Sequence, residues 1–77
     1  ELWVQFADKE AFFKEEDALK GILTSYPGKN PVVIYCKTER AVNRLGRDYM
    51  VSGDENLLFD LEKRYGKENI RVRSLGI

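Results

Sequence analysis

The chain has 77 residues, enough for one small domain and too few for two. Its 13 basic and 13 acidic side chains balance, which excludes a histone-like polycation and an acidic disordered tail. With no histidine and a single cysteine, it lacks the usual zinc ligands, the histidine of catalytic triads and the partner for an internal disulfide. No apolar run reaches the roughly 18 residues of a membrane span, so we expect a cytoplasmic domain.

Residues 1–6 alternate between apolar and other side chains, and this period of two predicts a half-buried strand. Residues 8–13 fit either a helix capped by Asp8 or a turn that tucks one of the adjacent Phe12 and Phe13 rings under the sheet. Residues 14–26 predict a helix with one apolar stripe, ended by Pro27-Gly28. Gly21 inside this helix suggests close packing against the sheet.

Residues 31–37 predict a central strand, because their apolar and β-branched side chains fall on both faces. After a turn at residues 38–40, residues 41–45 are expected to return as the partner strand of a hairpin. Residues 46–48 would break that strand and residues 49–51 would resume it.

Residues 52–66 carry the strongest helix pattern. Ser52 and Glu55 have the spacing of a capping box, and Gly66 suits the position after the last turn. Residues 70–73 alternate again and predict a last strand, followed by a tail at residues 74–77.

The order β-α-β-β-α-β predicts an α+β fold in one domain spanning residues 1–77. Two helices over four short strands make a two-layer sandwich the natural way to bury the apolar faces. The element order suggests the ferredoxin-like fold, with its split βαβ arrangement.

No catalytic, cofactor-binding or metal-binding set is predicted. Cys36 lies in the central strand in phase with its apolar neighbours, as expected for a small core residue rather than a nucleophile. The carboxylates of the last helix are accounted for by helix capping at Asp54 and Glu55 and by the solvent face at Asp60 and Glu62.

The sheet face turned away from the helices is the more informative feature. If Leu2, Val4, Val32, Ile34, Ile70 and Val72 face the helices, the other face carries aromatic, polar and basic side chains, namely Trp3, Gln5, Val33, Tyr35, Arg71 and Arg73. Such a face suits a protein docking surface. Aromatic residues beside arginines also occur where modules stack unpaired bases, so single-stranded nucleic-acid binding is the alternative.

The second half of the chain carries a family resemblance. Its successive elements are Pro31-Val32-Val33-Ile34-Tyr35, a basic hairpin, Arg44 to Ser52, Asn56-Leu57-Leu58-Phe59-Asp60-Leu61, Gly66 and Ile70-Arg71-Val72. This series resembles the extreme C-terminal domain of the bacterial DNA polymerase III alpha subunit, the DnaE type. Tyr49 and Gly53 depart from the tryptophan and proline that are frequent there. A chain that begins at Glu1 and has its one methionine at Met50 fits a C-terminal fragment of such a multidomain subunit.

The resemblance implies a replication role without catalysis in this segment. The parent subunit is a DNA-directed DNA polymerase, a nucleotidyltransferase whose acidic palm and divalent metals lie elsewhere. Its C-terminal region docks the clamp-loader tau subunit and follows an oligonucleotide-binding (OB) domain, which is a second possible partner, and it meets DNA only through the parent protein. We expect the contact residues to be Trp3, Val33, Tyr35, Arg40, Arg44 and Arg47.

Overall fold

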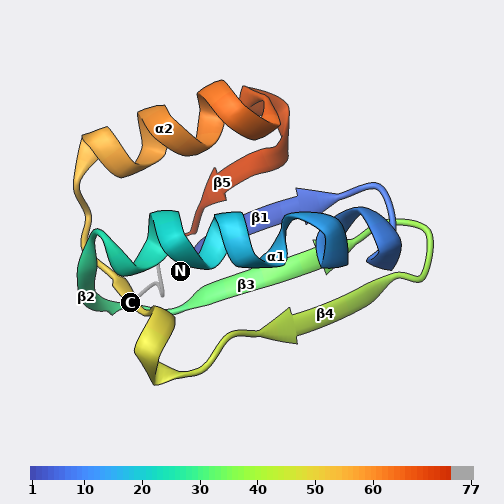
Figure 1. Ribbon diagram of the computed structural model, residues 1–77, viewed down its shortest axis with the longest axis horizontal. Helices are drawn as coiled ribbons and strands as arrows, with labels where there is room; N and C mark the ends of the chain where they lie inside the picture. The colour runs from blue at the N-terminus through green and yellow to red at the C-terminus, as the bar shows by residue number, and fades with distance from the viewer. Residues whose placement is uncertain (74–77) are drawn as a thin grey trace.

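The computed structural model describes residues 1–73, and the tail predicted at residues 74–77 lies outside them. Two short 3₁₀ turns, Arg47–Tyr49 and Lys67–Asn69, separate the later elements. In chain order (Figure 1), the helices and strands are β1 (Leu2–Phe6), α1 (Lys9–Thr24), β2 (Pro27–Asn30), β3 (Val32–Cys36), β4 (Ala41–Arg44), α2 (Glu55–Tyr65) and β5 (Ile70–Val72).

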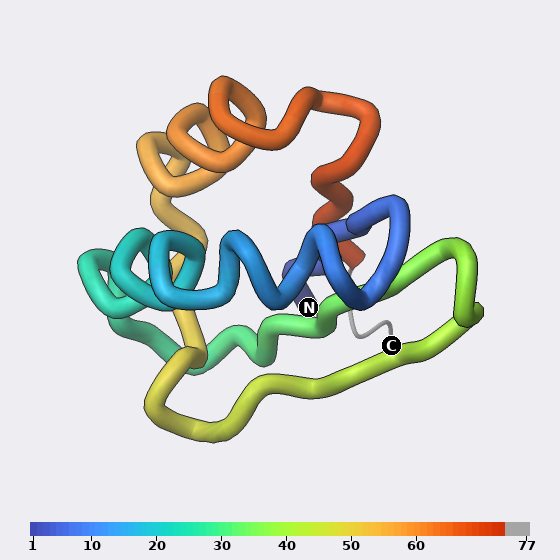
Figure 2. The backbone as a smooth tube through the Cα atoms, turned by 45° about the vertical axis from the view of Figure 1, so that its right-hand side comes forward, coloured from blue at the N-terminus to red at the C-terminus, as the bar shows by residue number. Residues whose placement is uncertain are grey.

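One mixed sheet and two helices form the two layers. The sheet has the order β4-β3-β1-β5, and both helices lie on the same side of it, as the two views show (Figures 1 and 2). The predicted α+β two-layer class is therefore confirmed. The element order is broadly compatible with the predicted ferredoxin-like fold. In this sheet, however, the strands before and after α1 in the main sheet, β1 and β3, are direct parallel neighbours, so no strand lies between them as it does in a split βαβ unit. The other two pairings, β1 with β5 and β3 with β4, are antiparallel.

The core lies between the sheet and the helices, where strand alternation meets two apolar helix stripes. In the register, Val4 stands between Ile34 on β3 and Ile70 on β5, so one face of the three strands is continuous and apolar. The buried members of this cluster are Leu2, Val4, Phe6, Phe12, Leu19, Leu23, Val32, Ile34, Cys36, Val51, Leu57, Leu61 and Ile70. Val72 lies opposite Leu2 on this face, as predicted, but it is 64% exposed because it belongs to a short edge strand.

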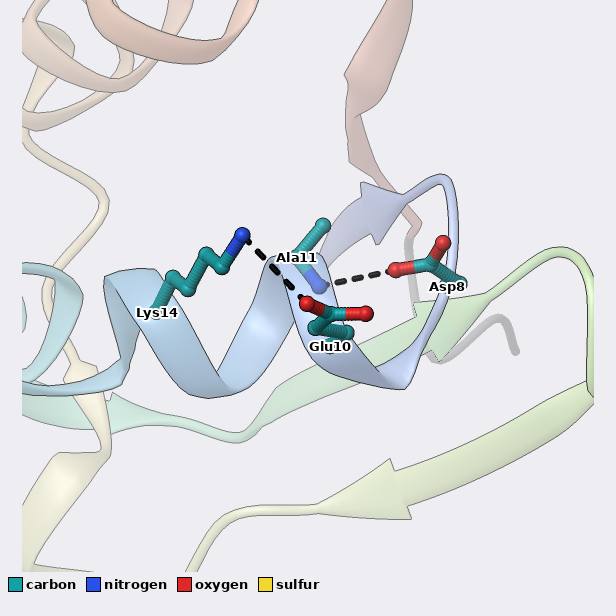
Figure 3. Close-up of polar contacts among 4 residues, drawn as sticks. All are labelled: Asp8, Glu10, Ala11 and Lys14. Atoms are coloured by element: carbon teal, nitrogen blue, oxygen red, sulfur yellow. Dashed lines mark hydrogen bonds and ion pairs between the residues drawn. The ribbon is translucent and has the colours of Figure 1, made fainter.

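α1 begins earlier than the apolar stripe alone predicts. Asp8 is the N-cap, and its side-chain Oδ1 accepts a hydrogen bond from the Ala11 backbone N–H at 2.8 Å (Figure 3). The same view shows the exposed ion pair between Lys14 and Glu10, at 3.4 Å. The alternative of a turn at residues 8–13 is wrong. Neighbouring residues of a helix point in different directions, so Phe12 enters the core while Phe13 stays 63% exposed.

The segment after α1 also differs from expectation. The helix ends at Thr24, and Pro27-Gly28 belongs to β2, a short strand outside the main sheet that bridges to Val51. The strand expected to resume at residues 49–51 is wrong, since the chain makes a 3₁₀ turn at Arg47–Tyr49 and only Val51 pairs with β2. Gly21 does not mark close packing, because a Cβ placed there would meet nothing within 4 Å.

The N-terminal cap of α2 differs from the predicted capping box of Ser52 and Glu55. Asp54 is the N-cap and its carboxylate accepts from the Asn56 N–H at 2.8 Å, while the Ser52 hydroxyl oxygen accepts from the Asp54 N–H at 3.3 Å. The helix ends at Tyr65, followed by Gly66 with φ of 92°, a left-handed conformation that favours glycine. The predicted role of Gly66 is thus confirmed.

Candidate docking surface on the open sheet face

The sheet face opposite the helices has no second layer over it among residues 1–73. Strand register brings its side chains into rows: Trp3 stands between Val33 and Arg71, and Tyr35 stands opposite Val42. We call this the open face, and it comprises Trp3, Gln5, Val33, Tyr35, Val42, Arg44, Arg71 and Arg73.

Trp3 is the centre of the open face and is only partly exposed. The Arg73 guanidinium lies over its ring at 5.2 Å from the centroid, which is a cation–π contact. The chain positions Arg73 there through the β1–β5 ladder, since the Arg73 N–H donates to the Glu1 carbonyl at 2.8 Å. One face of the indole is therefore already occupied by a cation.

An ion pair crosses the sheet next to Trp3. Arg44 Nη1 lies 2.7 Å from Glu1 Oε2, and the Glu1 side chain is only 9% exposed whereas that of Arg44 is 62% exposed. Burial acts to raise the pKa of the Glu1 carboxyl, but the proximity of the Trp3 indole and the charge of Arg44 outweigh it, so the pKa is lowered. Glu1 is therefore held as a carboxylate under Arg44.

Val33 lies on this face and is nevertheless fully buried. In the register its neighbours are Trp3 on one side and Arg44 on the other, two long side chains that can cover it. As a predicted contact residue, Val33 can reach a partner only if these neighbours move.

A shallow hollow of about 620 Å³ occupies the middle of the open face. It runs from Tyr35 and the 56% exposed Val42 on the β4 side to Arg71 on β5, with Trp3 between them. Gln5 forms part of its floor and is fixed by donating a hydrogen bond from Nε2 to Asn69 Oδ1 at 3.2 Å.

The structure brings together some of the predicted contact residues and separates others. Trp3, Val33, Tyr35 and Arg44 share the open face. Arg40 and Arg47 do not line the hollow, because Arg40 lies in the β3–β4 turn with φ of 52° and Arg47 begins the 3₁₀ turn beyond the other end of β4.

Val42 was not among the predicted contact residues. Its signal in the sequence is a single valine in the hairpin strand, between Ala41 and Asn43, two positions from Arg44 and so in phase with it. Arg71 and Arg73 were placed on this face by alternation but were not chosen as contacts.

The cysteine and carboxylates that the sequence offered as possible reactive groups have structural roles in the fold. Burial raises the pKa of the Cys36 thiol, which lies in the core. Asp60 accepts a hydrogen bond from the Tyr26 hydroxyl at 2.9 Å, and Asp54 caps α2. Within residues 1–73, no three His, Cys, Asp or Glu side chains come close enough to hold a metal ion together.

Comparison with family models, with curated proteins and with solved structures found no match for this chain. Neither α1 nor α2 has the length and apolar character needed to cross a lipid bilayer, and the described residues contain no other α-helix.

Proposed function

We propose that this domain is a non-catalytic docking module that binds a protein partner through the open face. The observation that carries the proposal is the hollow, in which Trp3, Tyr35 and the exposed Val42 are gathered on a sheet face that no helix of residues 1–73 covers. A compact apolar patch rimmed by charged side chains is typical of a protein interface.

The sequence resemblance to the C-terminal domain of a DNA polymerase III alpha subunit supplies a partner for this proposal. In that setting the open face docks the clamp-loader tau subunit or the neighbouring OB domain of the same chain. The domain then works in the bacterial cytoplasm and meets DNA through its parent protein.

Calorimetric titration of the domain with the tau subunit tests this function. Val42→Ser should weaken binding about tenfold, the effect of losing about 1.4 kcal/mol at an interface. Phe59→Ser is the matched control, since Phe59 is an apolar residue of similar exposure (64% against 56% for Val42) on α2 in the helix layer. No binding at tens of micromolar by the folded domain, or weakening by Phe59→Ser alone, would contradict the proposal.

Single-stranded nucleic-acid binding is the second candidate, favoured by aromatic and arginine side chains that share one exposed sheet face. It predicts that an oligonucleotide quenches Trp3 fluorescence and that rising salt weakens the binding steeply. A flat titration at low salt would exclude it.

A further inference from the structure

The charges of the molecule are segregated between its two layers. The helices α1 and α2 carry seven acidic and five basic side chains, a net charge of −2. The four strands of the sheet carry only two charged residues, Arg44 and Arg71. Arg73 directly after β5 and Glu1 directly before β1 bring the net charge of this layer to +2. The balanced total therefore conceals an electropositive sheet layer.

The arginines of the open face differ in whether a carboxylate of the chain already pairs with them. Arg44 already pairs with Glu1, and Arg73 stacks on Trp3. Within residues 1–73, no carboxylate lies within ion-pair distance of Arg71 or Arg73. Both arginines line the hollow, so their charges are available to a group that enters it.

Sheet geometry sets the spacing between these cations and the apolar wall. β5 and β3 are two strands apart, and in the register Arg71 is level with Val33, two residues along β3 from Tyr35. Two strand spacings across the sheet and two residues along it place the backbones of Arg71 and Tyr35 about 12 Å apart. Three to four residues of extended chain span about 10–13 Å. A segment crossing the face can therefore seat an apolar side chain at Tyr35 and Val42 and an acidic one at Arg71.

The same surroundings are less suited to a phosphate backbone. Glu68 lines the hollow, so its carboxylate would face a chain that carries a charge on every residue. The Arg73 guanidinium already lies over one face of the Trp3 indole, which leaves less of the ring surface for base stacking.

The geometry points to an acidic protein segment as the occupant of the open face, with an apolar side chain about three positions from a carboxylate. This inference rests on the proposed docking function and specifies the chemistry of the partner. The apolar side chain enters the hollow between Tyr35 and Val42, and the carboxylate pairs with Arg71 and Arg73.

NMR titration with short synthetic peptides tests the inference. The first peptide has one leucine and two aspartates that begin three positions later; a second has lysine for each aspartate, and a third has serine for leucine. We expect only the first to shift the Trp3 indole and Tyr35 resonances. We also expect Arg71→Glu to weaken its binding by about tenfold or more.

Lys29→Glu is the matched control, because it makes the same charge change at an exposed residue of β2 outside the hollow. Thermal melting of each variant checks that it remains folded. Equal binding of the lysine peptide, or no effect of Arg71→Glu, would overturn the acidic specificity. A thymidine oligonucleotide that shifts these resonances when the first peptide does not would overturn it in favour of nucleic acid.

The two proposals can fail separately. If no peptide binds while the tau subunit binds through Val42, the docking function stands and the acidic-segment inference is overturned. If the tau subunit does not bind while the first peptide does, the inferred chemistry stands and the named partner is wrong. If neither binds, both are wrong.

Discussion

At the scale of the residue, Val33 points to the open face and is still fully buried between its cross-strand neighbours. Val33 was read correctly as part of an apolar central strand, yet its choice as a contact residue overlooked the length of its neighbours Trp3 and Arg44. Alternation tells which face a side chain occupies but not what lies over it. Its burial therefore depends on cross-strand register, which a single sequence does not reveal.

Two glycines provide a test at this scale. A Cβ on Gly28 would lie 2.4 Å from both the Ser52 nitrogen and the Val51 carbonyl carbon, backbone atoms that cannot move aside cheaply. Gly28→Ala should therefore lower the free energy of unfolding by about 1–3 kcal/mol. Gly21→Ala, in the interior of α1 with open space around it, should raise it by up to about 1 kcal/mol.

Urea denaturation of the two variants measures both changes. Equal stability of Gly28→Ala and the parent chain would show that β2 and the Val51 segment do not pack as closely as described. Destabilisation by Gly21→Ala would show that α1 has a close neighbour at that position.

At the scale of elements, prediction was most reliable where a pattern was long and regular. The apolar stripe of α2 fits only a helix and the alternation of β1 fits only a strand, and the structure contains both elements. The start of α1 was ambiguous because the adjacent Phe12 and Phe13 satisfy no simple stripe. β2 was missed because Pro27-Gly28 is a strong turn signal, and its pairing with Val51 is long-range.

An ion pair joins the two helices and makes their association sensitive to acid. Arg64 Nε donates to Glu15 Oε1 at 2.8 Å, and this hydrogen bond lowers the pKa of the Glu15 carboxyl from its ordinary value of 4.5. A carboxyl with a lowered folded-state pKa stabilises the fold above its unfolded pKa. That contribution is lost as the pH falls below 4.5 and through the folded value.

We therefore expect Glu15→Gln to reduce the loss of stability between neutral pH and the range below 4.5, measured by chemical denaturation at a series of pH values. Glu10→Gln is the control. It removes a carboxylate from the same helix, where the side chains of Glu10 and its partner Lys14 are 77% and 73% exposed. An acid profile unchanged by Glu15→Gln would show that the Arg64 bond does not form in solution.

At the scale of the whole molecule, the two-layer class was predictable from the alternation of patterns, because helices and strands with one apolar face each have few ways to bury it. Which strands touch was not, since strand order depends on the path of the connections rather than on any local pattern. The docking surface was likewise predictable only in part. The open face was foreseen from alternation, while the hollow that links Val42 to Arg71 across four strands emerged only from their order.

The pairing of β1 has a consequence for how the chain reaches this structure. Leu2 is opposite Val32 on one side and opposite Val72 on the other. The same short strand therefore pairs with one strand about 30 residues away in the sequence and with another about 70 residues away. Contacts between residues so distant in sequence slow folding, because the entropy of closing the loop is lost before the contact forms. We expect α1 to form early and β5 to join last. The arginines at the end of the described sequence would then come into place only in the final step of folding.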